Sequence, residues 1–436
     1  MTGATLPMRD LVRPDSVHRD AYISPEVFQQ EQRSVFASAW IFITHASQLP
    51  RAGDFVTLDV AGQPLLVVRQ ADGAIAVLYN RCAHKGTKLF TSAAGNAGRV
   101  LRCPYHAWTY RLDGSLVGVP LKAEYEGSSF QQCEAGAGLV RVAQMEVYRD
   151  FVFARLAPRG PSFQEYFGPA LQWLDNMADR SPTGLLEVAG GVIRNVIRCN
   201  WKVYIENIND TVHPVSTHES AGKAARNVWS AQPGSAGMPM AVEQLLPFAS
   251  SYEFFTKMDA EVYANGHSAL GVSFSTHSSY ELPQDYRAAM DEAYGAGRAR
   301  EILGRAPQNA VFYPSLSVKS SPLAIRVIRP LAADRTLIEA WSFRAVGAPD
   351  LLLERALTYN RLVFSPMSIL AHDDIHLFES LQQGLRSNGS EWVSLHRGHR
   401  ASEVEETGTM VCAGTNELLM RNQFRAWAGM MHGMDA

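Results

Sequence analysis

Cysteine is scarce in this chain, with five among 436 residues. A small, odd number of cysteines does not build a disulfide framework, so the chain is not expected to be a disulfide-stabilised secreted scaffold. Three of them, Cys133, Cys199 and Cys412, have no partner at metal-ligand spacing. We predict that each of the three is a structural or free thiol. The other two, Cys82 and Cys103, lie in short motifs that also contain histidine.

Several other features are missing. No stretch approaches the roughly 18 consecutive apolar residues of a membrane span, and residues 1–15 lack the apolar centre of a signal peptide. The formal net charge of −3 gives no reason to expect nucleic acid or an anionic membrane as partner. No Gly-x-Gly-x-x-Gly motif follows a strand-like run, so a bound nicotinamide dinucleotide is not expected. With 46% hydrophobic and 19% charged residues, the chain is predicted to be globular and cytoplasmic, with an ample core.

Four potential metal ligands stand between Cys82 and His106. They form a Cys-x-His pair, Cys82 and His84, and a Cys-x-x-His pair, Cys103 and His106. Glycine or proline lies close to each pair, where backbone turns can direct two side chains at one point. Two thiolates and two imidazoles can hold a tetrahedral zinc ion. They can also hold a two-iron cluster, with both cysteines on one iron and both histidines on the other. The spacing leaves both alternatives open.

The surrounding residues predict a small antiparallel β-domain that carries these ligands on two loops. Short β-rich runs at 55–58, 64–68 and 75–79 precede the first pair and are separated by turn residues. Asp113-Gly114, after the second pair, predicts a hairpin turn.

The remainder of the chain mixes helical and strand patterns. Ser24-Pro25 predicts the start of a helix, with serine as the N-cap. We expect strands at 192–198, 315–318, 323–328 and 337–341, and helices at 166–177, 351–363, 373–383 and 417–431. Residues 221–245 are rich in glycine, alanine, proline and methionine, and they are the candidate for a mobile lid.

A second group of polar residues follows Asn200-Trp201-Lys202 in a helical-looking stretch. Asp210 and His213 are three positions apart and would share a helix face. His218 would be off that face, but Pro214 disfavours helical geometry at His213, so an irregularity could bring the second imidazole back.

Two histidines and a carboxylate on one face of a metal form the usual site of a non-haem Fe(II) that activates O2. The candidates for the third ligand are Asp373 and Asp374, at the start of a predicted helix. Taken singly, these acids could be a helix N-cap, the histidine pair could be incidental, and the cysteine–histidine motif could bind structural zinc. An electron-transfer cluster and an oxygen-activating iron belong to one mechanism, so their joint presence favours an enzyme that uses both.

The two motifs together resemble the large (alpha) subunit of Rieske-type aromatic-ring-hydroxylating oxygenases, closest to the members that act on aromatic carboxylates. The matching residues are Cys82, His84, Cys103, Tyr105, His106, Trp108, Asn200-Trp201-Lys202, Glu206-Asn207, Asp210, His213 and His218. The resemblance covers nearly the whole chain and implies an α+β fold, in which a small antiparallel β Rieske domain is inserted in a helix-grip catalytic domain. The expected limits are 39–157 and 158–436, with residues 1–38 packing on the catalytic domain.

The resemblance also implies the ligands of two metal centres. Cys82, His84, Cys103 and His106 would hold a [2Fe–2S] cluster, and His213, His218 and Asp374 would hold a mononuclear Fe(II). Asp374 is preferred to Asp373 because the family pattern places an acid five positions after the ligand, which here is Glu379.

A bridge between subunits is implied as well. Asp210 would hydrogen-bond to His213 within the chain and to His106 of the partner subunit. Such a bridge requires a trimer, with or without a small beta subunit. Electrons would come from a separate reductase, directly or through a ferredoxin, so NADH would act only indirectly.

Substrate contacts are less well defined by the sequence. Arg326 is expected to face the cavity, because Ile325 and Val327 would point the other way along the strand, and it could clamp a carboxylate with two hydrogen bonds. Arg326 could equally be a structural strand residue that pairs with an acid and does not contact the substrate. Asn207 could hydrogen-bond near the iron or be structural.

Three functions therefore stay open. The leading one is cis-dihydroxylation of an aromatic carboxylate. The runner-up is a Rieske-type monooxygenase or an O- or N-demethylase, and the third is a non-enzymatic metal or electron-carrier protein.

Overall fold

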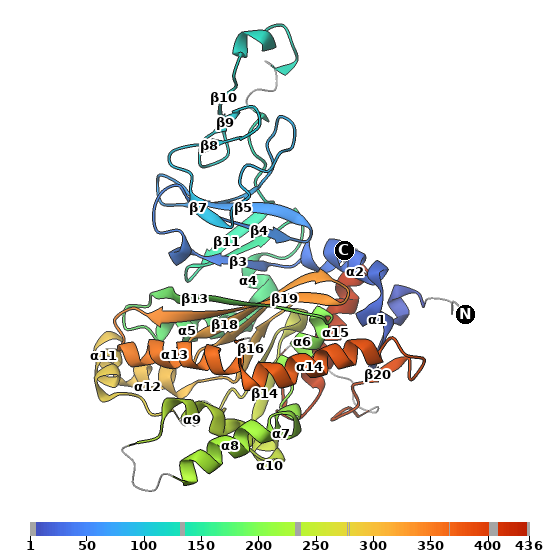
Figure 1. Ribbon diagram of the computed structural model, residues 1–436, viewed down its shortest axis with the longest axis vertical. Coiled ribbons are helices and arrows are strands. Elements are labelled where there is room, and N and C mark those ends of the chain that lie inside the picture. Colours follow the sequence, from blue (N-terminus) through green and yellow to red (C-terminus); the bar gives the residue numbers. More distant parts are fainter. Residues whose placement is uncertain are drawn as a thin grey trace. The chain divides into compact units, whose positions relative to one another are not determined.

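The computed structural model describes residues 6–130, 136–231, 237–276, 278, 280–365, 367–400 and 409–433. Cys133 therefore lies outside the described residues. The chain divides into two compact units, residues 36–160 and residues 1–35 with 161–436. Both contain antiparallel sheets and most helices belong to the second unit, so the predicted α+β class is confirmed (Figure 1). The domain limits 39–157 and 158–436 stay a prediction.

The smaller unit, residues 36–160, is built from short antiparallel strands. They are β3 (Ile41–His45), β4 (Asp54–Val60), β5 (Gln63–Arg69), β6 (Ile75–Tyr79), β7 (Ala94–Asn96), β8 (Leu101–Arg102), β9 (Thr109–Tyr110), β10 (Leu116–Gly118), β11 (Gln144–Tyr148) and β12 (Phe151–Arg155). They form three sheets, in the orders β6-β5-β4-β7, β10-β9-β8 and β11-β12-β3. The three predicted strands are confirmed as β4, β5 and β6, and Asp113-Gly114 lies in the turn between β9 and β10.

The larger unit contains an eight-stranded antiparallel sheet in the order β13-β19-β18-β17-β16-β15-β14-β21. Its strands are β13 (Leu186–Ile197), β14 (Asp259–Val262), β15 (Ser268–Leu270), β16 (Asn309–Phe312), β17 (Leu316–Lys319), β18 (Ala324–Ala332), β19 (Arg335–Ala345) and β21 (Met410–Ala413). A small second sheet joins β1 (Val12–Arg13), β2 (Ser16–His18) and β20 (Trp392–Ser394). Buried apolar residues dominate β16 to β19, as expected of central strands.

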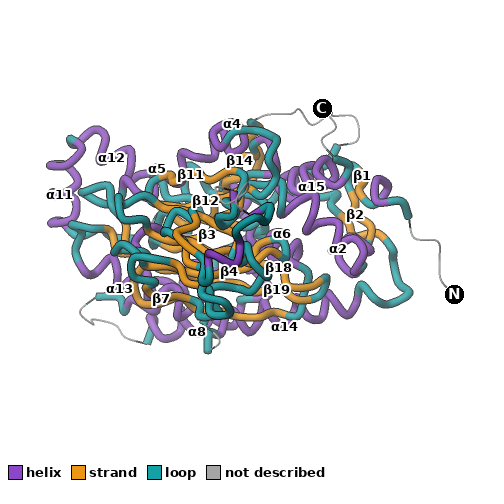
Figure 2. The backbone as a smooth tube through the Cα atoms, turned by 90° about the horizontal axis from the view of Figure 1, so that it is seen from above, coloured by secondary structure: helices purple, strands orange, loops and turns teal. Residues whose placement is uncertain are grey.

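Helices accompany the large sheet, and Figure 2 shows α11 and α12 at one end of this unit and α2 near the other. The helices are α1 (Asp20–Ile23), α2 (Pro25–Glu31), α4 (Phe163–Phe167), α5 (Gln172–Asp179), α6 (Trp201–Ile208), α7 (His213–Thr217), α8 (Glu219–Ser230), α9 (Met240–Leu245), α10 (Tyr252–Lys257), α11 (Gln284–Tyr294), α12 (Ala296–Gly304), α13 (Asp350–Val363), α14 (Ile369–Gly384) and α15 (Leu418–Met431). The predicted cap is confirmed, because Ser24 Oγ accepts from the Val27 amide. Among the described helices, none is both long and apolar enough to cross a membrane.

The lid proposed at 221–245 stays a prediction; α8 and α9 occupy much of this segment, while residues 232–236 lie outside the described part. Two other sequence predictions are corrected here. Helix α14 begins at Ile369 rather than at residue 373, because Ser368 caps it by accepting from the Ala371 amide. Asp210 and His213 do not share a helix face, because α6 ends at Ile208 and α7 begins at His213.

A buried charged cluster links helices α2, α6 and α15. The Lys202 ammonium on α6 donates to Glu31 on α2, and both side chains are fully buried. The indole of Trp201 donates to one oxygen of Glu31 over 2.9 Å, and the indole of Trp427 on α15 donates to the other over 2.7 Å. The Glu31 carboxylate is thus saturated with donors, which is what makes a buried charge tolerable.

Replacing Lys202 with methionine is expected to lower the free energy of unfolding by about 3–5 kcal/mol, because it leaves the Glu31 charge buried and short of a partner. Denaturant unfolding measures this effect. Lys223→Met is the matched control: Lys223 forms an exposed pair with Glu219 on α8, and its loss should cost less than about 0.5 kcal/mol. Equal losses of stability in the two variants would contradict the role of Lys202 as the buried partner of Glu31. Adding Glu31→Gln to Lys202→Met should restore part of the stability, because it removes the unpaired charge.

Candidate metal centres and active site

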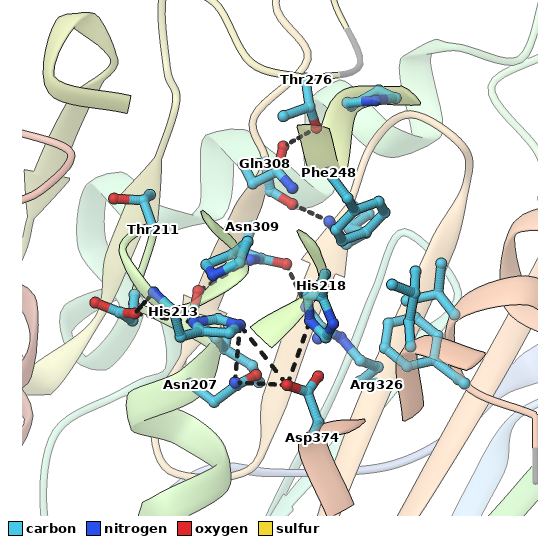
Figure 3. A pocket seen from close by; sticks show the side chains of 18 of the residues that line it. Asn207, Thr211, His213, His218, Phe248, Thr276, Gln308, Asn309, Arg326 and Asp374 are labelled. Atoms are coloured by element: carbon cyan, nitrogen blue, oxygen red, sulfur yellow. Dashed lines mark hydrogen bonds and ion pairs between the residues drawn. The ribbon is translucent and has the colours of Figure 1, made fainter. Parts of the chain in front are cut away.

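His213, His218 and Asp374 converge on one point in the larger unit (Figure 3). The Nε2 atom of His218 lies 3.3 Å from Asp374 Oδ1, and the Nε2 atom of His213 lies 3.8 Å from the same oxygen. One donor atom from each residue falls within 4.8 Å of the other two. Two imidazoles and one carboxylate in this arrangement could hold a metal ion and leave the opposite positions open.

A break in the helices makes this convergence possible. Pro214 stands in the first turn of α7, and the helix ends after five residues at Thr217. His218 has φ −103° and ψ 15°, outside regular helical geometry, and α8 starts directly after it. The five-residue spacing between His213 and His218 therefore spans a kink, so both rings can face Asp374.

The structure separates the two acids at positions 373 and 374. Asp374 faces the Nε2 atoms of both histidines. The Oδ2 atom of Asp373 lies 3.6 Å from Nδ1 of His218, on the opposite side of that ring. A carboxylate on the Nδ1 side favours the tautomer with its proton on Nδ1 and its lone pair on Nε2. Neither atom has a hydrogen-bond partner in the structure, so Asp373 acts on His218 through its charge, whereas Asp374 faces the point that both histidines share.

Asp210 lies in the turn between α6 and α7 and contacts His213 directly. Its Oδ2 atom accepts from His213 Nδ1 over 2.9 Å and from the backbone amides of His213 and Val212 over 2.7 and 3.1 Å. Its Oδ1 atom accepts from Arg397 over 2.8 Å. Burial opposes the ionisation of Asp210, but the hydrogen bonds from His213 and the charge of Arg397 prevail and lower its pKa. An ionised Asp210 fixes the His213 proton on Nδ1.

Asn207 lies on the last turn of α6 beside the same ligand point (Figure 3). Its amide nitrogen is 3.0 Å from His213 Nε2 and 3.4 Å from Asp374 Oδ1. The Asn207 side chain therefore borders the position where a metal would bind.

A pocket opens at this point and reaches the large sheet. Its lining residues include Asn207, Asp210, His213, His218, Asp374, Phe248, Gln308, Asn309, Lys319, Arg326, Tyr359 and Phe364. Arg326 faces this pocket, donates to Asn309 and, over 3.2 Å, to Ser317 Oγ, and lies over the Phe364 ring. It is only 6% exposed, and no described carboxylate lies within ion-pair distance of its guanidinium.

The pocket lining also contains Lys319, Asn309 and Gln308, which the sequence analysis did not predict. A signal for Lys319 is visible in hindsight, because Leu316-Ser317-Val318-Lys319 alternates apolar and polar residues although all four are buried. Alternation of this kind in a fully buried strand indicates that one face meets a polar cavity. Asn309 and Gln308 carry no comparable pattern.

The four candidate ligands of the smaller unit, Cys82, His84, Cys103 and His106, lie on two similar loops. Cys82 and Cys103 are buried, and each carbonyl accepts from the amide four residues further on, that of Gly86 or that of Ala107. Positive φ angles of 79° at Gly86 and 54° at Ala107 tighten both loops. The rings of His84 and His106 are 4.7 Å apart, edge to face.

The surroundings of these residues suit thiolate and imidazole ligands. Tyr110 Oη lies 3.1 Å from Cys82 Sγ, and the Trp108 ring stacks on His84 at 4.9 Å. His84 Nδ1 is buried without a hydrogen-bond partner, so it is available as a ligand. Burial, together with the neighbouring His106 and Lys85, lowers the pKa of His84 and keeps the ring neutral.

Two thiolates and two imidazoles can hold a tetrahedral zinc ion or a two-iron cluster with two ligands on each iron. Comparison with known proteins decides between the two.

Comparison with known proteins agrees with both centres. The family description "Rieske [2Fe-2S] domain" matches residues 39–140, and "Ring hydroxylating alpha subunit (catalytic domain)" matches residues 175–433. The large subunit of anthranilate 1,2-dioxygenase from Acinetobacter baylyi is 30% identical over 88% of this chain and 80% of its own length. The alpha subunit of N,N-dimethyl phenylurea N-demethylase from Sphingobium sp. is 28% identical over 95% of this chain and 90% of its own.

Solved structures share the fold. Naphthalene 1,2-dioxygenase with indole bound superposes with a TM-score of 0.79 at 24% identity, over 98% of this chain and 95% of that one. The matched catalytic-domain description covers more than half of this chain, and a relative at 30% identity spans most of it. The chain therefore belongs to the Rieske ring-hydroxylating oxygenases, oxidoreductases with a [2Fe–2S] cluster and a mononuclear iron, and it is similar throughout to their alpha subunits.

Proposed function

We propose that this chain is the terminal oxygenase component that cis-dihydroxylates the ring of an aromatic carboxylate with O2 and externally supplied electrons. One observation carries the proposal: Arg326, a buried cation without a described acidic partner, lines the same pocket as His213, His218 and Asp374. Two relatives support it by name, anthranilate 1,2-dioxygenase and toluate 1,2-dioxygenase from Pseudomonas putida, which is 27% identical over 87% of this chain.

The geometry supports a ligand assignment for both metal groups. Cys82, His84, Cys103 and His106 would hold the cluster. His213, His218 and Asp374 would hold the iron, with Asp373 and Asp210 orienting the two imidazoles from their Nδ1 sides. When bound, the two groups supply electrons one at a time and open coordination positions for O2 beside the substrate.

The side chains of the pocket would orient the substrate. Arg326 would hold the carboxylate, and the rings of Phe248 and Phe364 would flank the aromatic ring. Asn207, beside His213 Nε2, would donate a hydrogen bond near the reacting atoms. Asp210 would keep His213 in the ligating tautomer and accept a hydrogen bond from His106 of the partner subunit, as the second half of a relay between subunits.

The partners follow from the same scheme. The electron donor would be a separate reductase, acting directly or through a ferredoxin. The relay through Asp210 requires neighbouring subunits, so we propose a homotrimer or an α3β3 assembly with a small beta subunit.

Replacing Arg326 with glutamine tests the substrate assignment. We expect KM for benzoate-like acids to rise about 10- to 100-fold with little change in iron content, because charge-assisted hydrogen bonds contribute about 1.5–3 kcal/mol. Arg329→Gln is the control: Arg329 lies on the same strand, and its guanidinium is paired with Glu339 at 2.9 Å. An unchanged KM in Arg326→Gln would contradict the clamp. In the unaltered enzyme, labelled O2 should place both oxygen atoms in the diol.

N-demethylation is the second candidate, because an N-demethylase alpha subunit is similar over 95% of the chain. An uncharged phenylurea would leave the buried Arg326 cation without a counter-charge, which favours the carboxylate. Incubation with N,N-dimethyl phenylurea separates the candidates: release of formaldehyde without a diol would establish demethylation in place of dihydroxylation.

A further inference from the structure

The side chain of Asn309 connects the proposed substrate clamp to the helix that carries Asn207 (Figure 3). Asn309 begins strand β16, is 8% exposed and lines the pocket. Its Oδ1 atom accepts from the Arg326 guanidinium, and its Nδ2 atom donates to the carbonyl of Ile208 over 2.9 Å. One amide group thus bonds to the sheet at one end and to α6 at the other.

A primary amide suits these two partners because it carries both an acceptor and a donor. A guanidinium offers donors only, and a backbone carbonyl offers acceptors only. The oxygen of Asn309 therefore faces Arg326, and its nitrogen faces Ile208. An aspartate would keep the acceptor and lose the donor, and a leucine would lose both. The connection depends on the amide group and not on side-chain size alone.

Ile208 is the last residue of α6, next to the proposed iron ligands. The preceding residue, Asn207, places its amide nitrogen 3.0 Å from His213 Nε2 and 3.4 Å from Asp374 Oδ1. A hydrogen bond that holds the Ile208 carbonyl therefore holds the helix end that borders the metal position.

Arg326 is held by neutral groups. Besides Asn309, it contacts Ser317 Oγ at 3.2 Å and the face of the Phe364 ring. Ser317 is the residue opposite Arg326 on the neighbouring strand β17, so this contact fixes the guanidinium to the sheet. Tyr204, one turn back on α6, also interacts with Arg326. The contact through Asn309 differs from these because it ends at the metal position.

The distance between clamp and metal decides which ring carbons react. If Arg326 holds the carboxylate, the ring extends from the guanidinium towards the metal position, and the nearest carbons are oxidised. A misplacement of about 1 Å is enough to change reactivity about 100-fold. A group that fixes this distance therefore also fixes the position of oxidation.

We propose that Asn309 determines the regiospecificity of the reaction by fixing the distance between the carboxylate clamp and the metal position. Asn309 is then a positioning residue, because it acts through Arg326 and Ile208 and not on the reacting atoms. This inference rests on the proposed function, since it takes Arg326 as the carboxylate site and ring dihydroxylation as the reaction.

Two measurements on the iron-loaded enzyme test it. Without electron donor, the paramagnetic relaxation of fluorine in the three monofluorobenzoates reports the distance from iron to each ring position, and Asn309→Leu should change these distances. With electron donor and benzoate, the same variant should raise the ratio of minor to major cis-diol about 5-fold or more, the effect of one lost hydrogen bond. Asn309→Asp should also change this ratio, and it should raise KM because its charge neutralises the guanidinium.

Two control variants each remove one neighbouring hydrogen bond. Ser317→Ala loosens Arg326 without touching α6. Ser268→Ala removes the donor to Asn209 Oδ1, just after α6, without touching Arg326. In both variants Asn309 still joins Arg326 to α6, so the iron–fluorine distances and the diol ratio should match those of the unaltered enzyme. Equal iron and sulfide contents show that folded proteins are compared.

Three results would each overturn the inference: unchanged iron–fluorine distances in Asn309→Leu, an unchanged diol ratio in that variant, or changes of equal size in Ser317→Ala. Failure of the proposed function is recognised separately. In that case the unaltered enzyme forms no diol from benzoate, or Arg326→Gln binds benzoate as tightly as the unaltered enzyme. If diol forms and Arg326→Gln weakens binding while Asn309→Leu changes nothing, only the role of Asn309 is wrong.

Discussion

Replacing Asp374 with alanine is expected to remove the mononuclear iron and to leave the two irons of the cluster. The change deletes the carboxylate that, among the described residues, faces the Nε2 atoms of both His213 and His218. Loss of a direct ligand should weaken iron binding by more than the roughly 10- to 100-fold that follows from loss of an outer hydrogen-bond partner. Because a bound metal contributes several kcal/mol to such reactions, oxygenation should fall by about 1,000-fold or more.

Asp373→Ala is the matched control, one position away on the same helix. Asp373 lies 3.6 Å from the other nitrogen of His218, without a hydrogen bond, so its loss should reduce iron affinity by no more than the roughly 10- to 100-fold that follows from loss of an outer partner. Iron and sulfide analysis, with the visible spectrum of the cluster, measures both effects. Loss of the mononuclear iron in Asp373→Ala but not in Asp374→Ala would show that Asp373 is the ligand and Asp374 the outer residue.

The convergence of His213, His218 and Asp374 shows what the sequence can and cannot predict. The residue types allow the three side chains to form a metal site, and the cysteine–histidine motif earlier in the chain favoured this interpretation over an incidental histidine pair. The choice of Asp374 came from the family pattern. The spacing of the histidines could not by itself show that Pro214 and the break at His218 bring both rings to one side, because the kink depends on the packing of α7 and α8.

The strands were predicted better than the loops and the pocket. Runs rich in β-branched residues, bounded by glycine turns, identified β4 to β6, since that pattern has a local cause. The helices α8 and α9 within 221–245 were not predicted, because the glycine and proline content of this segment indicated irregular structure. Lys319 was missed because the partners that define its setting, Gln308 and Tyr359, come from other elements. Long-range contacts of this kind leave little trace in a single sequence.

Replacing Asp210 with alanine is expected to leave both metal centres loaded but to reduce turnover by at least about 100-fold. The variant keeps every proposed ligand, so with iron supplied in excess the iron and sulfide contents should match those of the unaltered enzyme, even where iron affinity falls about 10- to 100-fold. It removes the acceptor of His213 Nδ1, and loss of such a partner costs up to about 100-fold. In the proposed trimer the change also removes the contact with His106 of the partner subunit. Turnover should therefore fall by more than the loss of the His213 hydrogen bond alone would cause.

Two further variants separate these contributions. Asp210→Asn retains an oxygen that can accept from the backbone amides of Val212 and His213, so it keeps the turn folded while it removes the charge. Arg397→Met removes the partner of Oδ1 and leaves the contact with His213 in place. If Asp210 acts as the relay, Asp210→Asn should be nearly as slow as Asp210→Ala, whereas Arg397→Met should lose less than about 10-fold.

A single turnover of pre-reduced enzyme with substrate and O2 gives the decisive measurement. The Asp210 variants should reduce and reoxidise their clusters with normal spectra when external redox partners are used, yet form little product per chain. A structural role alone would instead lower metal content or the thermal midpoint in proportion to the loss of product. Normal single-turnover product from Asp210→Ala would contradict the relay, because the carboxylate would then be dispensable for delivering electrons between subunits.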